Sequence, residues 1–299
     1  MAGVKIASFN VWGIDGKDVG NAVRAAAGVA GPNVPEAIAI GFQEVWFGHQ
    51  RDHVLDAWQL DRTIDASMHY VGLDGYSSSA HGWKCLVPNV GKAGIPGLRS
   101  LELGSGLALC VRGPIIDAYF HKFQGGYVPD SFAKKGMIAA RIAPAGLRQR
   151  AIICTHFHDF SNDAGGGARR VNLEQLAGTV NWINQHWRVP IVIVGDFNID
   201  ARDAYLNNQP TINHTLYRKL TQLGKPPGQF WHDMNAQFNA FKPEPTQSDE
   251  DGAIDIQLLS GPAGKSNLHF ERFRFFRDTD PQQVAFSDHR LVCSTWSEP

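Results

Sequence analysis

The sequence predicts an α/β protein in which two mixed β-sheets pack face to face and helices cover the outer faces. Apolar runs of strand length alternate with segments whose apolar residues recur every three or four positions, which is the helical period. Residues 105–157 hold four strand-like runs with short connections, which predicts antiparallel hairpins. No linker rich in proline or glycine divides the chain, so we expect one domain over residues 1–299.

The first third of the chain predicts two strand–helix pairs followed by a loop. Residues 4–11 and 36–46 are apolar runs that predict strands, and residues 50–66 have a helical pattern. Residues 18–30 also predict a helix. Its buried side is expected to hold Val19, Val23, Ala26 and Ala30. Residues 69–105 are rich in glycine and serine, so we expect a long irregular loop, a feature that is often functional.

The rest of the chain predicts one long helix and several further strands. Five large apolar residues recur at helical spacing. They are Leu173, Leu176, Val180, Ile183 and Trp187. The β-branched residues 191–194 predict a buried strand, and a polar region follows at 201–250. The last strands are expected at 253–260, 268–276 and 289–296.

The composition limits the classes of function. The formal net charge is −1, so no general positive field attracts nucleic acid or an anionic membrane. The four cysteines show no metal-binding spacing, and three lie in apolar runs, so we expect free buried thiols. No apolar run reaches the roughly 20 residues that span a bilayer, and no signal peptide precedes the first strand. The compartment stays open between the cytoplasm and secretion with a removed signal, and we expect a monomer.

Polar side chains adjoin six of the apolar runs where strands begin or end. They are Asn10, Glu44, His156, Asp196 with Asn198, Asp255, and Asp288 with His289. A lone Asn or Asp at such a place is usually a turn former, but Glu and His are not typical turn residues. If these strand ends converge, their carboxylates raise one another's pKa by repulsion, and a divalent cation would relieve it. Oxygen ligands without thiolates favour Mg²⁺, Mn²⁺ or Ca²⁺ over Zn²⁺.

Asp196 and Asn198 lie two residues apart after a buried strand. In an extended segment, side chains two residues apart point the same way, so we expect both to face one ligand. Phe197 between them is then expected to face the core.

Six short motifs occur in a fixed order: FNVWG, QEVW, TH, GDFN, ID and SDH. As an ordered set from Phe9 to His289, they resemble the endonuclease/exonuclease/phosphatase superfamily. That superfamily includes pancreatic-type nucleases, inositol polyphosphate phosphatases and neutral sphingomyelinases. The resemblance implies a four-layer α/β sandwich and a metal-dependent hydrolase of phosphoric diesters.

The resemblance also implies a metal site and a water site. Glu44 would be the principal metal ligand, with Asn10 and Asp288 nearby. Asp196 and Asn198 would orient or activate the attacking water and hold a phosphate oxygen. The cation would neutralise the phosphate oxygens and the leaving alkoxide.

Two histidines receive catalytic roles from the same resemblance. His289 would be the general base, and a hydrogen bond from its ring N–H to Asp255 would fix its tautomer and raise its basicity. His156 would face the phosphate and stabilise the charge that develops in the transition state.

Further stretches resemble the neutral sphingomyelinase branch: FNVWGI with QEVW, SGLALCVRGPI with YFHKF, and DSFAKKGMIAARI. The last is similar to an Asp-x4-Lys-Gly segment of that branch and matches it at Asp130 and Lys135. There the lysine would lie beside the site and neutralise the phosphate, although a solvated hairpin tip is the alternative for both residues. The implied function is Mg²⁺-dependent, phospholipase C-type hydrolysis of sphingomyelin or a related phospholipid at a membrane surface. The alternatives are a DNase-like endonuclease or an inositol-phosphate phosphatase, with nucleic acid the less favoured partner.

Other features leave two interpretations open. His158 and Asp159 follow His156, and His158 either joins the site or faces solvent. Three arginines alternate with phenylalanines and predict a solvated edge strand or a contact for a phosphate-rich substrate. They are Arg272, Arg274 and Arg277. Several large apolar residues either enter a membrane interface or pack in the core. They are Trp83, Leu86, Phe120, Phe123 and Tyr127.

Overall fold

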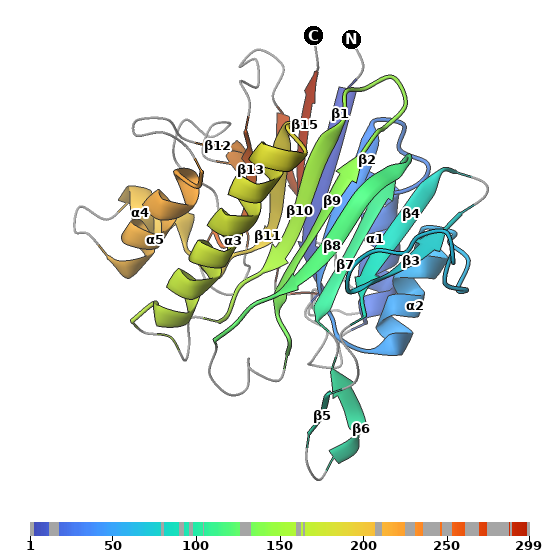
Figure 1. Ribbon diagram of the computed structural model, residues 1–299, viewed down its shortest axis with the longest axis horizontal. Helices are drawn as coiled ribbons and strands as arrows, with labels where there is room; N and C mark the ends of the chain where they lie inside the picture. The colour runs from blue at the N-terminus through green and yellow to red at the C-terminus, as the bar shows by residue number, and fades with distance from the viewer. Residues whose placement is uncertain are drawn as a thin grey trace, which may run out of the picture.

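The structure is a computed structural model of the protein. The described residues are 3–11, 18–78, 81–89, 93–95, 98–103, 105–125, 133–159, 163, 165–206, 211–224, 231–235, 246, 253–260, 269–273, 287 and 289–297. The elements in chain order are β1 (Gly3–Asn10), α1 (Val19–Ala30), β2 (Ala37–Val45), α2 (Gly48–Ala57), β3 (Leu73–Ser77), β4 (Trp83–Pro88), β5 (Ala93–Ile95), β6 (Leu98–Leu103), β7 (Gly106–Arg112), β8 (Ile115–Lys122), β9 (Gly136–Ile142), β10 (Arg150–His156), α3 (Gly167–His186), β11 (Ile191–Asp196), α4 (Ala201–Leu206), α5 (Ile212–Thr221), β12 (His232–Asp233), β13 (Asp255–Leu259), β14 (His269–Phe273) and β15 (Leu291–Ser297) (Figure 1).

Two mixed sheets form the centre of the fold, as the sequence predicts. The larger sheet has seven strands in the order β14-β15-β1-β2-β7-β4-β3, and the smaller has six in the order β12-β13-β11-β10-β9-β8. Each sheet contains one parallel pair, β1 with β2 and β10 with β11. The remaining ladders are antiparallel. Of the four strands expected over residues 105–157, β8, β9 and β10 form an antiparallel meander, whereas β7 lies in the larger sheet. A separate two-stranded ribbon, β5-β6, extends beyond the sheets at the end away from the two termini (Figure 1).

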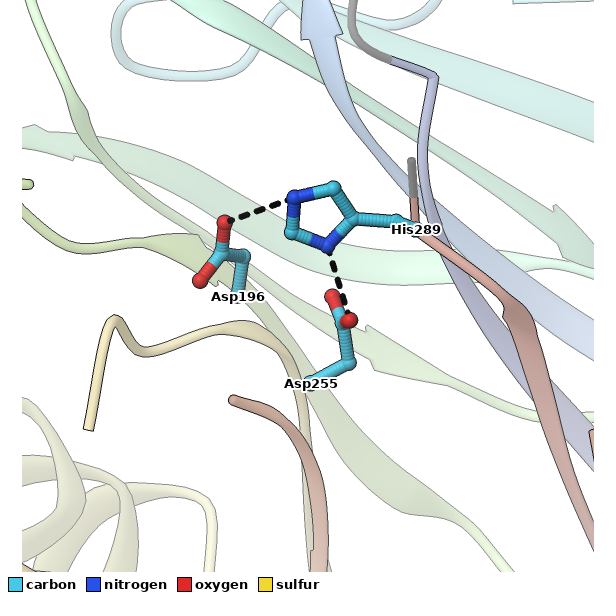
Figure 2. A group of neighbouring side chains, drawn as sticks. All are labelled: Asp196, Asp255 and His289. Carbon is cyan, nitrogen blue, oxygen red and sulfur yellow. Dashed lines mark hydrogen bonds and ion pairs between the residues drawn. The ribbon is translucent and has the colours of Figure 1, made fainter. Parts of the chain in front are cut away.

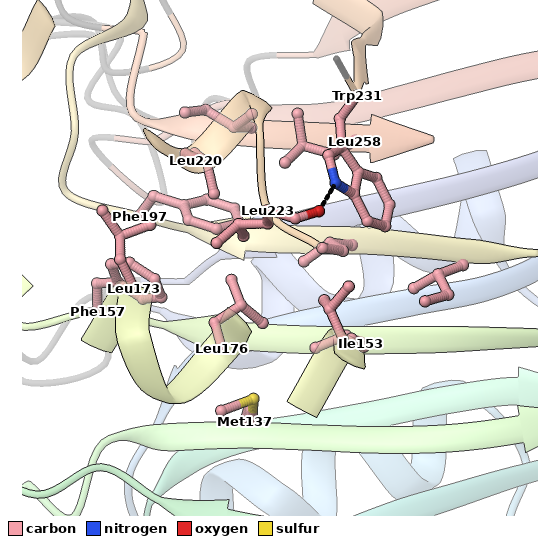
Figure 3. Close-up of a cluster of buried hydrophobic side chains, with 14 of the residues drawn as sticks. Met137, Ile153, Phe157, Leu173, Leu176, Phe197, Leu220, Leu223, Trp231 and Leu258 are labelled. Atoms are coloured by element: carbon pink, nitrogen blue, oxygen red, sulfur yellow. Dashed lines mark hydrogen bonds between the residues drawn. The ribbon is translucent and has the colours of Figure 1, made fainter. Parts of the chain in front are cut away.

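Three apolar layers hold the sheets and helices together. The middle layer joins the two sheets and contains Ile6, Leu109, Ile152 and Val194, all essentially without solvent exposure. On one outer face, α1 and α2 pack on the larger sheet. On the other, α3 and α5 pack on the smaller sheet (Figure 3). The result is a four-layer α/β sandwich, which confirms the predicted fold class.

The long helix α3 matches the predicted periodicity. Its apolar residues contact the smaller sheet and α5. Leu173 and Leu176, for example, pack with strand residues such as Ile153 (Figure 3). Because side chains three or four apart share one face of a helix, this contact fixes which residues of α3 point toward the sheet. That orientation matters for the polar residues at the start of the helix.

Two predictions about the first third of the chain were wrong. The helix expected over 50–66 ends at Ala57, because Gln59 adopts a left-handed φ of 55° and the Leu60 amide donates to the Leu55 carbonyl at 2.8 Å. This is a helix-ending motif that the apolar pattern does not reveal. The region 69–105 contains β3 to β6 rather than an irregular loop. The strands β3 and β4 form a hairpin. Burial of strand residues such as Trp83 and Leu86 stabilises it despite the local glycine and serine content.

The cysteines and the helices bear on two further sequence-based expectations. All four cysteines are free and buried, as predicted. Burial raises the pKa of the Cys154 and Cys293 thiols to about 12, which makes them unreactive at neutral pH. Within the described residues, no helix combines the length and the apolar character needed to cross a membrane.

Candidate active site

The strand ends that carry the predicted site residues meet at one end of the sandwich. In the larger sheet, the last residue of β1, Asn10, lies beside Gln43 of the parallel strand β2. In the smaller sheet, His156 at the end of β10 lies beside Asp196 at the end of β11. Asp255 begins β13 and pairs with Asp196 across an antiparallel ladder. Parallel strands present their carboxyl ends at the same edge, so the topology itself assembles this group.

One oxygen atom, Oδ2 of Asp196, is the meeting point. The side-chain amide of Asn10, from the opposite sheet, donates to it at 3.0 Å. The Nε2 atom of His156 lies 3.5 Å from it and the Nε2 atom of His289 lies 3.9 Å from it. All four side chains are buried. Three segments distant in the sequence therefore converge on one carboxylate.

The second oxygen of Asp196 is held by its own loop. The backbone N–H of Asn198 donates to Oδ1 at 2.9 Å, and Asn198 adopts a left-handed φ of 49°. Asparagine tolerates this conformation better than most residues do. The expectation of an extended segment from Asp196 to Asn198 was therefore wrong, because β11 ends at Asp196 and the chain turns. The Asn198 amide instead donates to the Phe157 carbonyl at 3.2 Å, while Phe197 is fully buried in the core as predicted.

His289 lies between two carboxylates (Figure 2). Its Nδ1 atom is 2.9 Å from Oδ2 of Asp255, and its Nε2 atom faces Asp196. The Ser287 hydroxyl accepts from the His289 backbone N–H at 3.1 Å and donates to the Asn10 carbonyl at 2.8 Å. This serine links the approach to β15 with the end of β1. The imidazole is thus held in one orientation with one nitrogen directed into the site.

Glu44 enters the site through a β-bulge. The register between β2 and β7 shifts after Phe42, and Glu44 has a left-handed φ of 63°. Bulges redirect a side chain, and a positive φ at a non-glycine residue is strain that recurs at functional sites. The Oε1 atom of Glu44 accepts from the Asn10 amide at 3.2 Å. Asn10 therefore bridges the carboxylates of Glu44 and Asp196.

Lys135 reaches the same region from the start of β9. Lys135 as a whole residue is only 5% exposed, and its ammonium group donates to the Phe157 carbonyl at 3.0 Å. A solvated hairpin tip is thus excluded for Lys135. The positive charge of Lys135 contributes to a lowered pKa at His156, in addition to the larger effect of burial.

The titration behaviour of the site follows from its burial. Desolvation, the largest cause, raises the pKa of Asp196 to about 7, and the nearby Asp255 charge acts in the same direction. The pKa of His156 falls well below its usual value, so this ring is neutral at pH 7. The Nδ1 atom of His156 is buried and has no hydrogen-bond partner among the described residues. It offers an unused polar atom beside Asp196.

The donor atoms fit a hard divalent cation. Glu44, Asp196 and Asp255 supply carboxylate oxygens, and Oδ1 of Asp255 is buried without a hydrogen-bond partner in the described part of the chain. Ligand atoms of Asp196, Asp255 and His289 also lie within 4.8 Å of one another. In that trio, however, Nδ1 of His289 is already engaged by Asp255. The carboxylates bridged by Asn10 provide the oxygen-rich alternative that Mg²⁺ prefers.

Some residues singled out in the sequence are not described by the structure, and others lie at a sheet edge or in the core. Asp130, Asp288, Arg274, Arg277 and Tyr127 fall outside the described residues. Arg272 lies on β14, the edge strand of the larger sheet, as the edge-strand interpretation predicts. His158 does not face solvent, because it is buried and its ring nitrogen lies 2.9 Å from Oδ1 of Asn172. Trp83, Leu86 and Phe123 are core residues and are not available to a membrane surface.

Some neighbours of the site were not recognised in the sequence. The indole ring of Trp46 lies 6.0 Å from the His156 ring, centroid to centroid. Gly195 has a φ of 150°, and a Cβ atom there would lie 2.0 Å from the Thr155 carbonyl oxygen. Trp46 and Gly195 belong to the motifs QEVW and GDFN, but these motifs do not indicate which residues the two contact in the folded protein.

The chain is similar to known proteins in structure but not in sequence. No family model matches the chain, and no curated protein matches it. Among solved structures, sphingomyelinase C from Streptomyces griseocarneus has a TM-score of 0.61 at 12% identity, covering 99% of this chain and 100% of its own. A beta toxin mutant from Staphylococcus aureus with bound magnesium ions has a TM-score of 0.58 at 15% identity, covering 99% of each chain. Truncated TDP2 from Caenorhabditis elegans has a TM-score of 0.60 at 15% identity, covering 99% of this chain and 98% of its own.

Proposed function

Because the chain has the fold of the endonuclease/exonuclease/phosphatase superfamily, we propose that it is a metal-dependent phosphoric diester hydrolase. The observation that carries the proposal is the convergence of Asn10, His156 and His289 on one oxygen of Asp196. A phosphodiester is anionic and resists attack by hydroxide, so its hydrolysis needs a base, a positioned water and neutralisation of charge. The site offers a group suited to each need.

Glu44 and Asn10 would hold the cation, with Asp288 as a further ligand. When bound, the ion would supply neutralisation of the non-bridging oxygens and of the leaving alkoxide. We propose Mg²⁺, with Mn²⁺ or Ca²⁺ as substitutes, because the donors are oxygens. The magnesium ions in the beta toxin structure support this choice.

His289 would take the proton of the attacking water. Asp255 holds Nδ1, which leaves Nε2 as the acceptor directed toward Asp196. Asp196 and Asn198 would orient the water, and Asn198 also fixes the Asp196 carboxylate. His156 and Lys135 would face the phosphate, where a neutral N–H and an ammonium group stabilise negative charge.

For the substrate, we propose sphingomyelin or a related phospholipid, cleaved to release the phosphorylated head group. The fold similarity to sphingomyelinase C, over 99% of this chain, is consistent with this substrate. The buried Lys135 adds support, since its segment resembles that of neutral sphingomyelinases. The second candidate is an endonuclease or an inositol-phosphate phosphatase. TDP2 has a similar TM-score, so fold similarity alone does not rank the substrates.

A paired assay tests the substrate. Purified protein with Mg²⁺ is incubated with sphingomyelin vesicles and, separately, with supercoiled plasmid DNA and with an inositol polyphosphate. We expect release of phosphocholine from the vesicles and loss of that release after chelation with EDTA, restored by added Mg²⁺. Plasmid nicking or inorganic phosphate release without phosphocholine would transfer the function to the second candidate. Full activity after exhaustive chelation would contradict the metal requirement.

The β5-β6 ribbon supports contact with a membrane surface. It extends from the end of the sandwich that carries the site, away from both termini (Figure 1). Its sequence includes Ile95, Leu98, Leu101 and Leu103 and only two charged residues. A projecting element rich in aliphatic residues can enter the interfacial region of a bilayer. We propose this ribbon as the membrane contact, in place of the buried Trp83, Leu86 and Phe123.

A double substitution tests the ribbon. We expect Leu98→Asp with Leu101→Asp to lower co-flotation of the protein with sphingomyelin vesicles by about tenfold, because two charges oppose insertion at the interface. Ile64→Asp is the matched control, since Ile64 is an aliphatic residue that is 52% exposed elsewhere on the surface. Equal flotation of both variants would remove the ribbon from the membrane contact.

A further inference from the structure

The first turns of α3 carry two buried polar residues that the reaction described above does not use. Arg169 and Asn172 lie three positions apart, so they share one face of the helix. Both are nearly inaccessible to solvent. Buried polar groups of this kind are costly unless they are hydrogen-bonded, so their partners indicate what they do.

Asn172 holds the peptide that follows the end of β10. Its Oδ1 atom accepts from the His158 backbone N–H at 3.0 Å. That N–H belongs to the same peptide unit as the Phe157 carbonyl, which accepts from Lys135 at 3.0 Å and from Asn198 at 3.2 Å. One peptide unit is thus held on its N–H side by the helix and on its carbonyl side by two site residues. His156 lies immediately before it.

Arg169 holds the turn that follows β11. Its Nη1 atom donates to the Asn198 carbonyl at 2.7 Å and to Oδ1 of Asn213 at 3.2 Å. Its charge is balanced by the buried Asp163, whose carboxylate lies 3.4 Å from Nε and also accepts from the Arg169 backbone N–H at 3.0 Å. Asn198 is the residue with left-handed backbone that fixes Asp196. The guanidinium group therefore stabilises this strained turn through the Asn198 carbonyl.

We propose that Arg169 and Asn172 are positioning residues that set the separation of His156 and Asp196. This inference rests on the proposed hydrolase function. The helix α3 is anchored on the smaller sheet by Leu173 and Leu176. It contacts both the segment after β10 and the turn after β11. A displacement of about 1 Å in a catalytic group can cost 10²-fold in rate, so a rigid common anchor has a large effect on turnover.

The test compares Asn172→Ala with Thr179→Ala. Thr179 is the matched control, because it is a buried polar residue on the same helix, about 10 Å along the axis at 1.5 Å per residue. With the substrate that the wild type cleaves, we expect Asn172→Ala to lower kcat by at least about tenfold while KM changes less than about threefold. Thr179→Ala should keep kcat within about twofold. Asn172→Asp retains the acceptor oxygen and should recover most of the lost kcat.

A second readout does not depend on turnover. In ¹⁵N-histidine NMR spectra of the whole protein, we expect the ring signals of His156 and His289 to move or broaden in Asn172→Ala and to stay in place in Thr179→Ala. If the wild type cleaves none of the substrates offered, the proposed function fails, and these signals still decide the inference. A kcat loss in Asn172→Ala no larger than that of the control, or no recovery in Asn172→Asp, would overturn the positioning role.

Arg169→Lys covers the case in which Asn172→Ala does not fold. Lysine keeps a positive charge against Asp163 but cannot reproduce the simultaneous contacts of the guanidinium group with Asn198, Asn213 and the Asp163 carbonyl. We expect a folded protein with a lowered kcat, a similar KM and displaced His156 signals. Wild-type kcat in this variant would overturn the proposal. Failure of both variants to fold would do the same, because it would make the two residues structural.

Discussion

Substitution of His289 by alanine is expected to lower kcat by at least about 10²-fold, the low end of the effect of a general base. Asp255 holds one ring nitrogen at 2.9 Å and leaves the other directed at Asp196. Loss of the ring removes the only candidate base that has both an orienting carboxylate and an unblocked nitrogen among the described residues. Steady-state kinetics with the substrate that the wild type cleaves measure the effect.

A matched histidine elsewhere separates this effect from general damage. His269→Ala, on the edge strand β14, removes a ring whose side chain is 57% exposed, and its kcat should stay within about twofold of the wild type. Asp255→Asn should fall between the two, because the ring remains but its tautomer is no longer fixed. A loss below about tenfold in His289→Ala would move the base role to another group.

Substitution of Asp196 by asparagine is expected to abolish turnover and, without divalent ions, to flatten the pH dependence of stability. The folded protein holds the Asp196 proton up to a pKa of about 7 because burial disfavours the carboxylate, whereas an ordinary aspartate releases it near 3.8. Between these values the folded state binds more protons than the unfolded state. The free energy of unfolding therefore falls as the pH rises through this window.

The size of the effect follows from the two pKa values. Their difference is worth about 4 kcal/mol at pH values above both, as an order of magnitude. Urea unfolding in EDTA at pH 5 and pH 8 samples about 3 kcal/mol of it, the part that lies between pH 5 and the raised pKa, in the wild type and in Asp196→Asn. The lowered pKa of His156 acts in the opposite direction in both proteins, so the wild type should lose about that much stability relative to the variant over this interval.

Added Mg²⁺ provides the control for this second prediction. A cation beside the site favours the ionised carboxylates, so it should restore stability to the wild type at pH 8. Glu44→Gln should weaken the restoration, because it removes a proposed ligand. Identical pH profiles of the wild type and Asp196→Asn in EDTA would show that Asp196 ionises normally in the folded protein.

The strand pattern and the chemistry of the site could be read from the sequence because they depend on local features. Apolar runs marked β1, β2, β10 and β11, and helical periodicity marked α3. The polar residues stood at the ends of those runs, where Asn10, His156, Asp196 and Asp255 now lie. The order of the motifs carried the expected fold. Each of these features lies within about ten consecutive residues, so it can be recognised in a single sequence.

The early end of α2 and the pairing of β3 with β4 could not be read in this way. A left-handed Gln59 ends the helix, and burial of hairpin side chains such as Trp83 between the larger sheet and its covering helices decides the hairpin. Both depend on contacts made only after the chain has folded. The same is true of Asn198, whose left-handed turn replaced the extended segment that the spacing predicted.

By itself, the sequence determined that carboxylates and imidazoles end several buried strands, because residue type and apolar period are local properties. The tertiary structure alone decided that Asn10 of one sheet and His289 near the other end of the chain reach the same oxygen of Asp196. It also decided that Arg169 and Asn172 lie behind the loops that carry the site. Such distances arise from the packing of two sheets and a helix, which no run of residues specifies alone.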